Sequence, residues 1–353
     1  NIMNEIGYLD KMVNGLLGFL GNLKAAIMTV PALIGSMPVL GGAAVSAPLV
    51  DRIGSGLSLS PEKKATINLV FRHGMFFVFP FSPSMILASN LLDVPVTTLV
   101  ARLWPYGLMF WITGYLFLLA KDTEAPISAE STVFGSESAA TEPALSHPKD
   151  SRLTYLSGFL KYGSPLLLAL ALSLLFSLPL WTSLSAGILL ALLMAHHETL
   201  PLPSLAAISK GANMSQVMAM LLIMVFKGLV SASPVFPEMV SKATQKGISP
   251  ALLAVALPFL LGYATASQTT TIGVLLPILV PTGISHTATM HFMAVIYGSS
   301  FISYFASPLH LCQILTCEYY DTDLTKVYRL YWPVLVFVAA IVAFYAVAAA
   351  RVV

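Results

Sequence analysis

Charged side chains are scarce in this sequence. Only 10% of its 353 residues are charged, whereas soluble domains carry about 25%. Hydrophobic residues make up 57%, and the mean hydropathy is +0.82. A soluble core cannot absorb so much apolar surface, so we predict a polytopic, all-α protein of the lipid bilayer, in the cytoplasmic (inner) membrane of a prokaryote. The net charge of +2 gives no electrostatic support for a nucleic-acid partner.

Cysteine and enzyme motifs are also sparse. Cys312 and Cys317 form no CxxC pair, so they indicate neither a disulfide framework nor a zinc site, and we interpret them as packing residues. The "HHE" at 196–198 is not HExxH, and neither a GxSxG nor a Walker motif occurs. We therefore expect no enzymatic activity and no cofactor, apart from Na⁺ as a coupling ion.

Long apolar runs dominate what is present. A polar stretch over 121–152, rich in Ser, Thr, Ala, Pro and acidic residues, interrupts them and is typical of a flexible linker. It divides the chain into membrane repeat 1 (1–120) and membrane repeat 2 (153–353). The apolar runs lie near 67–92, 99–120, 163–178, 180–195, 214–231, 288–306 and 329–349.

Two apolar stretches contain helix breakers and are too short to span a bilayer twice. The first has arms near 22–37 and 43–56, and the second has arms near 250–263 and 270–281. Irregular backbone at membrane depth must be buried in protein or line a wet cavity. We therefore predict a re-entrant helical hairpin in each half.

The two halves align as an internal repeat. Pro258 and Gly262 each lie 227 residues after Pro31 and Gly35, and Ser-Pro and Trp-Pro pairs recur in the same order. Repeated halves with Gly/Pro-interrupted segments are typical of secondary transporters. The first copy lacks partners for the runs from 153 to 231, which predicts that about 70–75 residues, two or three spans, are missing before Asn1.

Loop charges set the orientation. Arg52, Lys63, Lys64, Lys326 and Arg329 place loops 51–66 and 321–329, with the linker, in the cytoplasm. The two hairpins then enter from opposite sides, so we predict inverted repeats.

The site is expected where hairpin tips meet broken helices. Each half has a long segment that is broken at Ser-Pro, and such breaks free backbone groups that can hold an anion or Na⁺. Hydroxyls in the tip can instead bond their own helix. The predicted binding residues are Gly41, Gly42, Ser46, Ser82, Pro83, Ser84, Thr265, Ser267, Gln268, Thr269, Thr270, Ser307, Pro308 and His310.

Three further side chains leave alternatives open. Arg72 and His73 lie within an apolar run, where a charge is costly and usually functional, but they are near its start, where arginine can reach the interface. His310 either relays a proton or contacts substrate, or it is a packed, hydrogen-bonded histidine.

Four stretches carry a resemblance to a known family. They are "GSMPVLGGAAVSAPLVD" (35–51), "INLVFRH" (67–73), "FPFSPSMILAS" (79–89) and "SPLHLCQILTCEYY" (307–320). The chain resembles the integral-membrane family called domain of unknown function 401, within the ion transporter superfamily of citrate, gluconate and dicarboxylate permeases. The resemblance implies inverted repeats, two re-entrant hairpins, a homodimer, and elevator-type transport of organic anions with Na⁺ or H⁺. The tip "GGAA" differs from the Ser-Asn-Thr tips of the Na⁺-dicarboxylate carriers.

The function expected from sequence is secondary active transport of a small organic anion, coupled to Na⁺ or H⁺. A channel-like passive permease and a non-transporting membrane scaffold or sensor remain alternatives. Ion-gradient dependence and saturation distinguish a carrier from a channel.

Overall fold

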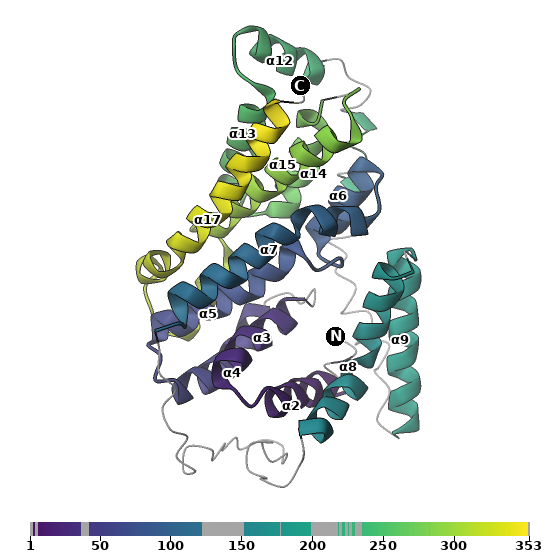
Figure 1. Cartoon of the computed structure of the whole chain (residues 1–353), viewed down its shortest axis with the longest axis vertical. Helices are drawn as coiled ribbons and strands as arrows, with labels where there is room; N and C mark the ends of the chain where they lie inside the picture. Colours follow the sequence, from purple (N-terminus) through teal and green to yellow (C-terminus); the bar gives the residue numbers. More distant parts are fainter. Residues whose placement is uncertain are drawn as a thin grey trace. The chain divides into compact units, whose positions relative to one another are not determined.

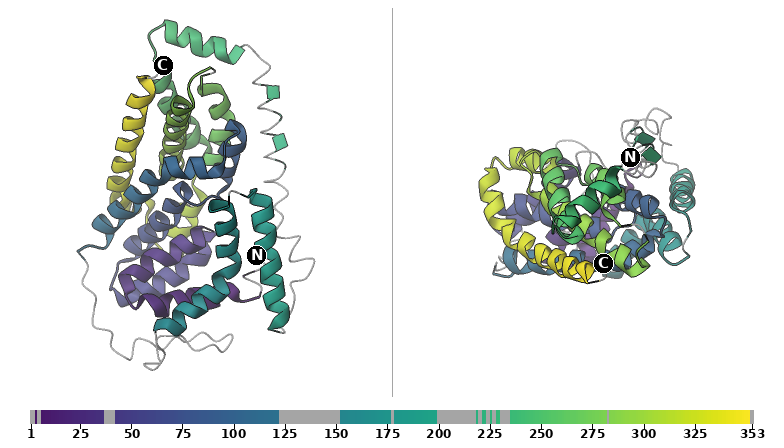
Figure 2. Two further views of the ribbon diagram at one scale, coloured as in Figure 1. Left: turned by 45° about the vertical axis from the view of Figure 1, so that its right-hand side comes forward. Right: turned by 90° about the horizontal axis from the view of Figure 1, so that it is seen from above.

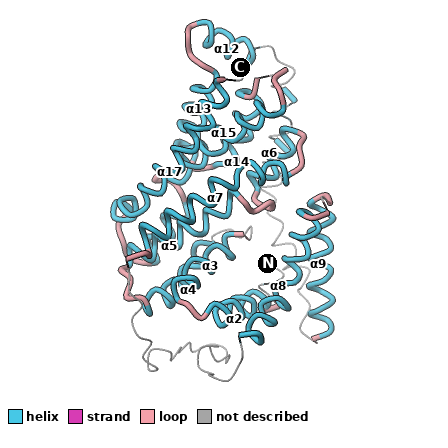
Figure 3. The backbone as a smooth tube through the Cα atoms, viewed as in Figure 1, coloured by secondary structure: helices cyan, strands magenta, loops and turns pink. Residues whose placement is uncertain are grey.

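The computed structural model describes residues 6–36, 42–121, 152–176, 178–198, 235–281 and 283–351, together with Met3 and a few positions between 218 and 229. Within these ranges the chain is helical, with loops and no strand (Figures 1 and 3). The all-α class predicted from composition is confirmed. The linker 121–152 apart from its two end residues, most of the run 214–231, and Gly41 lie outside the described residues.

The chain divides into two compact units. Unit 1 comprises Asn1–Val30, Leu49–Leu59 and Asp122–Asn213, and unit 2 comprises Pro31–Pro48, Ser60–Lys121 and Met214–Val353. These are packing units, and they do not test the division into repeats at 1–120 and 153–353, which stays a prediction.

In unit 1, α2 (Tyr8–Leu20) packs on α8 (Arg152–Leu174), and α8 packs on α9 (Leu180–His197). Small residues permit both contacts. A Cβ on Gly15 would lie 2.6 Å from the Phe159 nitrogen, and one on Gly187 would lie 2.5 Å from the Pro165 oxygen. Close backbone approach at small residues is how apolar helices associate when lipid removes the hydrophobic drive between them. The apolar runs near 163–178 and 180–195 thus form adjacent helices.

Glu198, just past α9, joins two lysines of unit 1. Its carboxylate lies 2.6 Å from Lys161 Nζ and 3.6 Å from Lys11 Nζ. The Lys161 ammonium holds the pKa of the Glu198 carboxyl below its usual value of 4.5. A lowered pKa stabilises the fold above that usual value, and the contribution is lost as the pH falls through the lower folded pKa.

We therefore expect Glu198→Gln to destabilise the protein by less than about 1 kcal/mol at neutral pH, since both lysines are partly exposed. Below pH 4.5 the wild type should lose this advantage. Melting temperatures of both proteins, measured across that range in detergent, check the expectation. An unchanged gap between the two curves at every pH would contradict it.

Unit 2 is built around α15 (His286–Ala306), most of whose side chains are buried. It packs against α13 (Pro250–Thr265), α14 (Gln268–Leu279) and α17 (Leu324–Ala350), and α17 also packs on α7 (Val96–Leu118) and α5 (Pro61–Gly74). Figure 2 shows α17, in yellow, running beside the green helices α13 and α15. Aromatic rings fill the centre: Phe77 stacks near Tyr106 with centroids 5.1 Å apart and contacts Phe301 at 4.4 Å.

Two long apolar segments of unit 2 are broken where the sequence has Ser-Pro. The first runs as α5, a short 3₁₀ turn (η1, Met75–Phe77) and α6 (Pro83–Leu92). The second runs as α15 and α16 (Leu311–Tyr319), with Ser307 to His310 between them. Proline at the first position of a helix lacks only an N–H that would be unpaired anyway, and Ser82 caps α6 by accepting from Met85 N at 3.3 Å. Both predicted breaks are confirmed.

The arms of the predicted hairpins are also helices. The first pair is α3 (Leu23–Gly35) and α4 (Gly42–Gly56), and its turn lies outside the described residues. The second pair, α13 and α14, turns at Ala266, which has a left-handed φ of 48°, and at Ser267. At about 1.5 Å per residue, none of these helices reaches the roughly 30 Å of a hydrocarbon core. That they enter and leave the membrane on one side stays a prediction.

Three helical stretches of the described chain are long and apolar enough to cross a bilayer: Arg152–Ser173, His286–Tyr319 and Leu324–Ala350. Large apolar side chains are exposed on α7, α8, α9 and α17, among them Trp104, Trp181, Trp332 and Phe344. Apolar faces of this extent suit contact with lipid. The chain is therefore a helical membrane protein.

Candidate functional site

The first broken helix is joined to the second hairpin by buried polar side chains. Ser84 Oγ on α6 donates to Gln268 Oε1 at the start of α14 (3.1 Å), and Gln268 Nε2 donates to the Tyr297 carbonyl on α15 (3.4 Å). The Tyr297 hydroxyl donates to the Phe76 carbonyl in the first break (2.8 Å). Sequence reasoning named Ser82, Ser84 and Gln268 separately, and the structure brings Ser84 and Gln268 into direct contact.

Most hydroxyls of the second tip bond within their own hairpin. Thr265 donates to the Leu261 carbonyl (2.7 Å), and Ser267 accepts from Thr270 N and contacts the Thr270 hydroxyl (2.8 Å). Thr269 is partly buried, and among the described residues its hydroxyl has no hydrogen bond. Local bonding therefore accounts for Thr265, Ser267 and Thr270, whereas the Thr269 hydroxyl has no such local partner among the described residues.

The second break is fastened to α13 through serines of α15 and Ser307. Ser299, Ser303 and Ser307 donate to the carbonyls of Val255 (2.6 Å), Pro258 (3.1 Å) and Tyr263 (2.7 Å). Pro258 and the close approach at Gly262 leave room for these bonds, since a Cβ on Gly262 would lie 2.2 Å from Ser303 Oγ. Ser307 thus holds helices together, whereas Pro308 is exposed.

A buried cluster lies where the C-terminal end of α5 meets the second break. Arg72 is 5% exposed, His73 is fully buried and His310 is 2% exposed. Among the described residues, Arg72 forms no ion pair, and its Nε and Nη1 have no hydrogen-bond partner; the same holds for His310 Nε2. This burial favours the functional alternative for Arg72 over an interfacial anchor.

Hydrogen bonds fix both imidazoles of this cluster. His73 Nδ1 donates to the Leu69 carbonyl (2.7 Å), so its Nε2 accepts from the Tyr304 hydroxyl (3.3 Å). His310 Nδ1 lies 3.2 Å from the Gln313 side-chain nitrogen, which also donates to the Phe305 carbonyl. The two imidazole centroids are 4.9 Å apart at a steep angle.

The family model described as "Protein of unknown function (DUF401)" matches residues 1–139 and 138–348, almost the whole chain. The chain belongs to this family. No curated protein matches it. The two DUF401 matches meet inside the polar stretch 121–152 that separates the predicted repeats.

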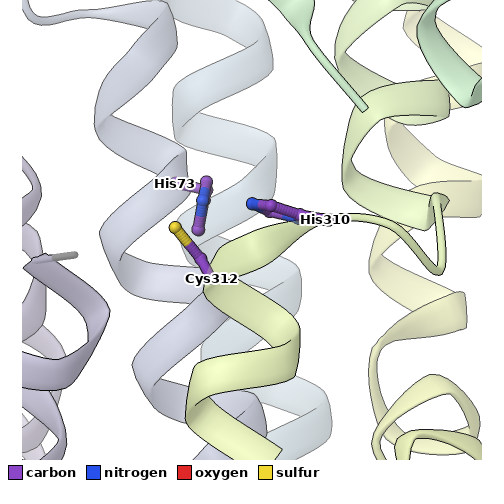
Figure 4. Close-up of side chains that lie close together, drawn as sticks. All are labelled: His73, His310 and Cys312. Atoms are coloured by element: carbon purple, nitrogen blue, oxygen red, sulfur yellow. The ribbon is translucent and has the colours of Figure 1, made fainter. Parts of the chain in front are cut away.

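From the sequence we interpret both cysteines of this DUF401 chain as packing residues, but the structure gives Cys312 polar neighbours. Cys312 is a free, half-buried thiol beside His73 and His310, and Figure 4 shows the three side chains pointing toward one another. One potential ligand atom from each of the three lies within 4.8 Å of the others. The spacing "HLC" at 310–312 puts the histidine and cysteine two residues apart, and that signal was available in the sequence.

Tyr297, Tyr304 and Gln313 were missed as well. Each acts through a partner distant in sequence or through the turn of the break, so an apolar helical pattern does not reveal it.

The first tip stays a prediction: Gly41 is outside the described residues, Gly42 begins α4, and Ser46 is buried. Near it, the Tyr320 hydroxyl donates to the Ala47 carbonyl (2.7 Å), which ties α4 to the end of α16.

Proposed function

We propose that this DUF401 protein is a secondary active transporter of a small organic anion, coupled to Na⁺ or H⁺. One observation carries the proposal: polar side chains of two interrupted helical segments meet inside an apolar unit, through the Ser84–Gln268–Tyr297 hydrogen bonds. Buried polar groups in such a setting are costly and therefore mark function.

The helix ends supply the electrostatics. α6 begins after Ser82, α14 after Ser267 and α16 after His310, all at breaks in apolar segments. A helix N-terminus carries a partial positive charge and unpaired N–H groups, which suit an anionic group. The breaks also expose carbonyl groups that suit a coupling cation.

The element order supports a repeat. A pair of short helices, a broken segment and a long helix with an internal proline occur as α3 to α7 and again as α13 to α17, with Pro105 and Pro333 in the long helices. The remaining parts of the proposal are inverted orientation, a homodimer, elevator-type movement of the hairpins and location in a prokaryotic inner membrane.

A thermal-shift screen tests the proposal. The purified protein is heated with carboxylates, amino acids or sugar acids, each with Na⁺ or choline at two pH values. A ligand that binds only the folded state stabilises it and so raises the melting temperature. At a hundredfold excess over Kd the stabilisation is about 2.7 kcal/mol. We expect an organic anion to stabilise the protein, more strongly with Na⁺ or at one pH. No shift with any anion would count against the proposal.

A further inference from the structure

We infer that His73, His310 and Cys312 form a binding site for a soft metal ion, Cu⁺, where α5 meets the second break. The site goes beyond the proposed transport function and does not depend on it. One potential ligand atom from each side chain lies within 4.8 Å of the other two, and Figure 4 shows the side chains pointing toward one another. Imidazole nitrogens and a thiolate are ligands that copper and zinc ions accept.

The ring of His73 is turned so that it can offer a lone pair. Its Nδ1 lies 2.7 Å from the Leu69 carbonyl, which can only accept, so Nδ1 carries the proton and Nε2 of the neutral ring carries the lone pair. The Tyr304 hydroxyl donates to Nε2 at 3.3 Å, which is long for a hydrogen bond, so a metal can displace it. Histidines that bind metals usually donate their other ring nitrogen to a carboxylate or a backbone carbonyl, as His73 does.

The ring of His310 is oriented in the same way. It hydrogen-bonds to the Phe305 carbonyl, and because its Nε2 has no partner among the described residues, Nδ1 is the donor. The Gln313 side-chain nitrogen donates to the same carbonyl, so two donors 3.2 Å apart share one acceptor. His310 Nε2 is thus a buried lone pair that no described donor meets. A buried acceptor without a donor is destabilising, and a bound ion removes that cost.

The backbone holds the three side chains in place. His310 is the residue before α16, and Cys312, a free and partly buried thiol, lies in the first turn of that helix. His73 belongs to the last turn of α5, which packs on α16. A metal bound to all three would therefore fasten the first broken segment to the second.

The spacing of the ligand atoms suits an ion with three ligands. Bonds of about 2.0–2.3 Å in a flat, three-ligand site separate the ligand atoms by about 3.5–4 Å. The cluster, with separations of up to 4.8 Å, reaches this spacing by small side-chain rotations. Among the described residues, no fourth His, Cys, Asp or Glu belongs to it. Cu⁺ accepts three ligands, whereas structural Zn²⁺ takes four.

The local charge also favours Cu⁺ over Zn²⁺. Arg72 precedes His73 in the chain, is 5% exposed and interacts electrostatically with Cys312. Metal binding releases the thiol proton, so Cu⁺ and the Cys312 thiolate together are neutral. Zn²⁺ with the same thiolate would keep a net positive charge beside the buried guanidinium, and an uncompensated buried charge is costly. A soft thiolate ligand suits Cu⁺ as well.

The experiment measures metal binding to the purified, reduced full chain in detergent after chelator treatment. Cu⁺ and Zn²⁺ are added separately, without oxygen, in competition with a chelator of known affinity. We expect one Cu⁺ per chain, weaker binding of Zn²⁺, and a higher melting temperature with Cu⁺. Cys312→Ser should weaken Cu⁺ binding by at least about a hundredfold, because it removes a ligand. Cys317→Ser is the matched control: it lies on the same helix, outside the cluster, and should bind Cu⁺ as the wild type does.

Two further measurements keep the inference testable if Cys312→Ser does not fold. X-ray absorption of the Cu⁺-loaded wild type should show one sulfur and two nitrogen ligands. Tyr304→Phe should bind Cu⁺ at least as tightly as the wild type, because it removes the hydroxyl that competes for His73 Nε2. A copper shell without sulfur, equal Cu⁺ binding by Cys312→Ser and the wild type, or tighter binding of Zn²⁺ than of Cu⁺ would overturn the inference. Weaker binding by Tyr304→Phe would contradict the assigned lone pair.

Discussion

Gly262→Leu should destabilise the protein by about 2–3 kcal/mol, the cost of overpacking a helix contact. A Cβ at this position would lie 2.2 Å from Ser303 Oγ and 3.2 Å from the Ser300 carbonyl oxygen. The first atom can rotate away, but the carbonyl belongs to the backbone of α15. Leucine must therefore push α13 from α15 and break the Ser303 and Ser307 bonds to α13. Melting temperature in detergent measures the loss.

Gly158→Leu is the matched control. Gly158 lies on α8, and a Cβ there meets nothing within 4 Å. Leucine also has the better helix propensity, so the control should melt at or slightly above the wild-type temperature. Equal destabilisation by the two variants would show that the contact at Gly262 is not what holds α13 to α15.

Thr269→Val should reduce solute uptake by tenfold or more while leaving the melting temperature unchanged. Thr269 follows the turn of the second hairpin, and its hydroxyl forms no hydrogen bond among the described residues. Valine keeps the shape and removes the hydroxyl. Loss of one hydrogen bond to a ligand costs about 1.4 kcal/mol, which is tenfold in affinity. Uptake into proteoliposomes, with the anion found by thermal shift, measures the effect.

Thr265→Val makes the same change in the last residue of α13, on the other side of the turn. The Thr265 hydroxyl already donates to Leu261 of its own helix, so uptake should stay within twofold of the wild type. If Thr265→Val lost uptake and Thr269→Val kept it, the assignment of the ligand-facing hydroxyl would be wrong.

The breaks in the helices could be predicted because their causes are local. Ser82 and Ser307 lie before prolines in apolar runs. Proline lacks a backbone N–H and disfavours the helical conformation of the residue before it. The turn of the second hairpin was placed to within a few residues for the same reason, since "TASQ" interrupts a continuous apolar stretch. A helix end that is set by residues next to it in the sequence can therefore be predicted from the sequence.

The composition of the site depends on contacts between distant residues and could be predicted only in part. Ser84 meets Gln268 across 184 positions, and nothing near either residue indicates the other. Thr269 and Thr270 look alike in sequence, but only the geometry of the turn gives Thr270 a local partner. Arg72 could be read as an anchor or as a functional charge until its burial and the packing of Gly35 against it were known.

The most direct test of the account is uptake of a stabilising carboxylate into proteoliposomes, with and without an imposed Na⁺ or proton gradient. The account predicts saturable uptake that exceeds the external concentration only when a gradient is present. Uptake that merely equilibrates, does not saturate and ignores both gradients would contradict it and identify a passive permease.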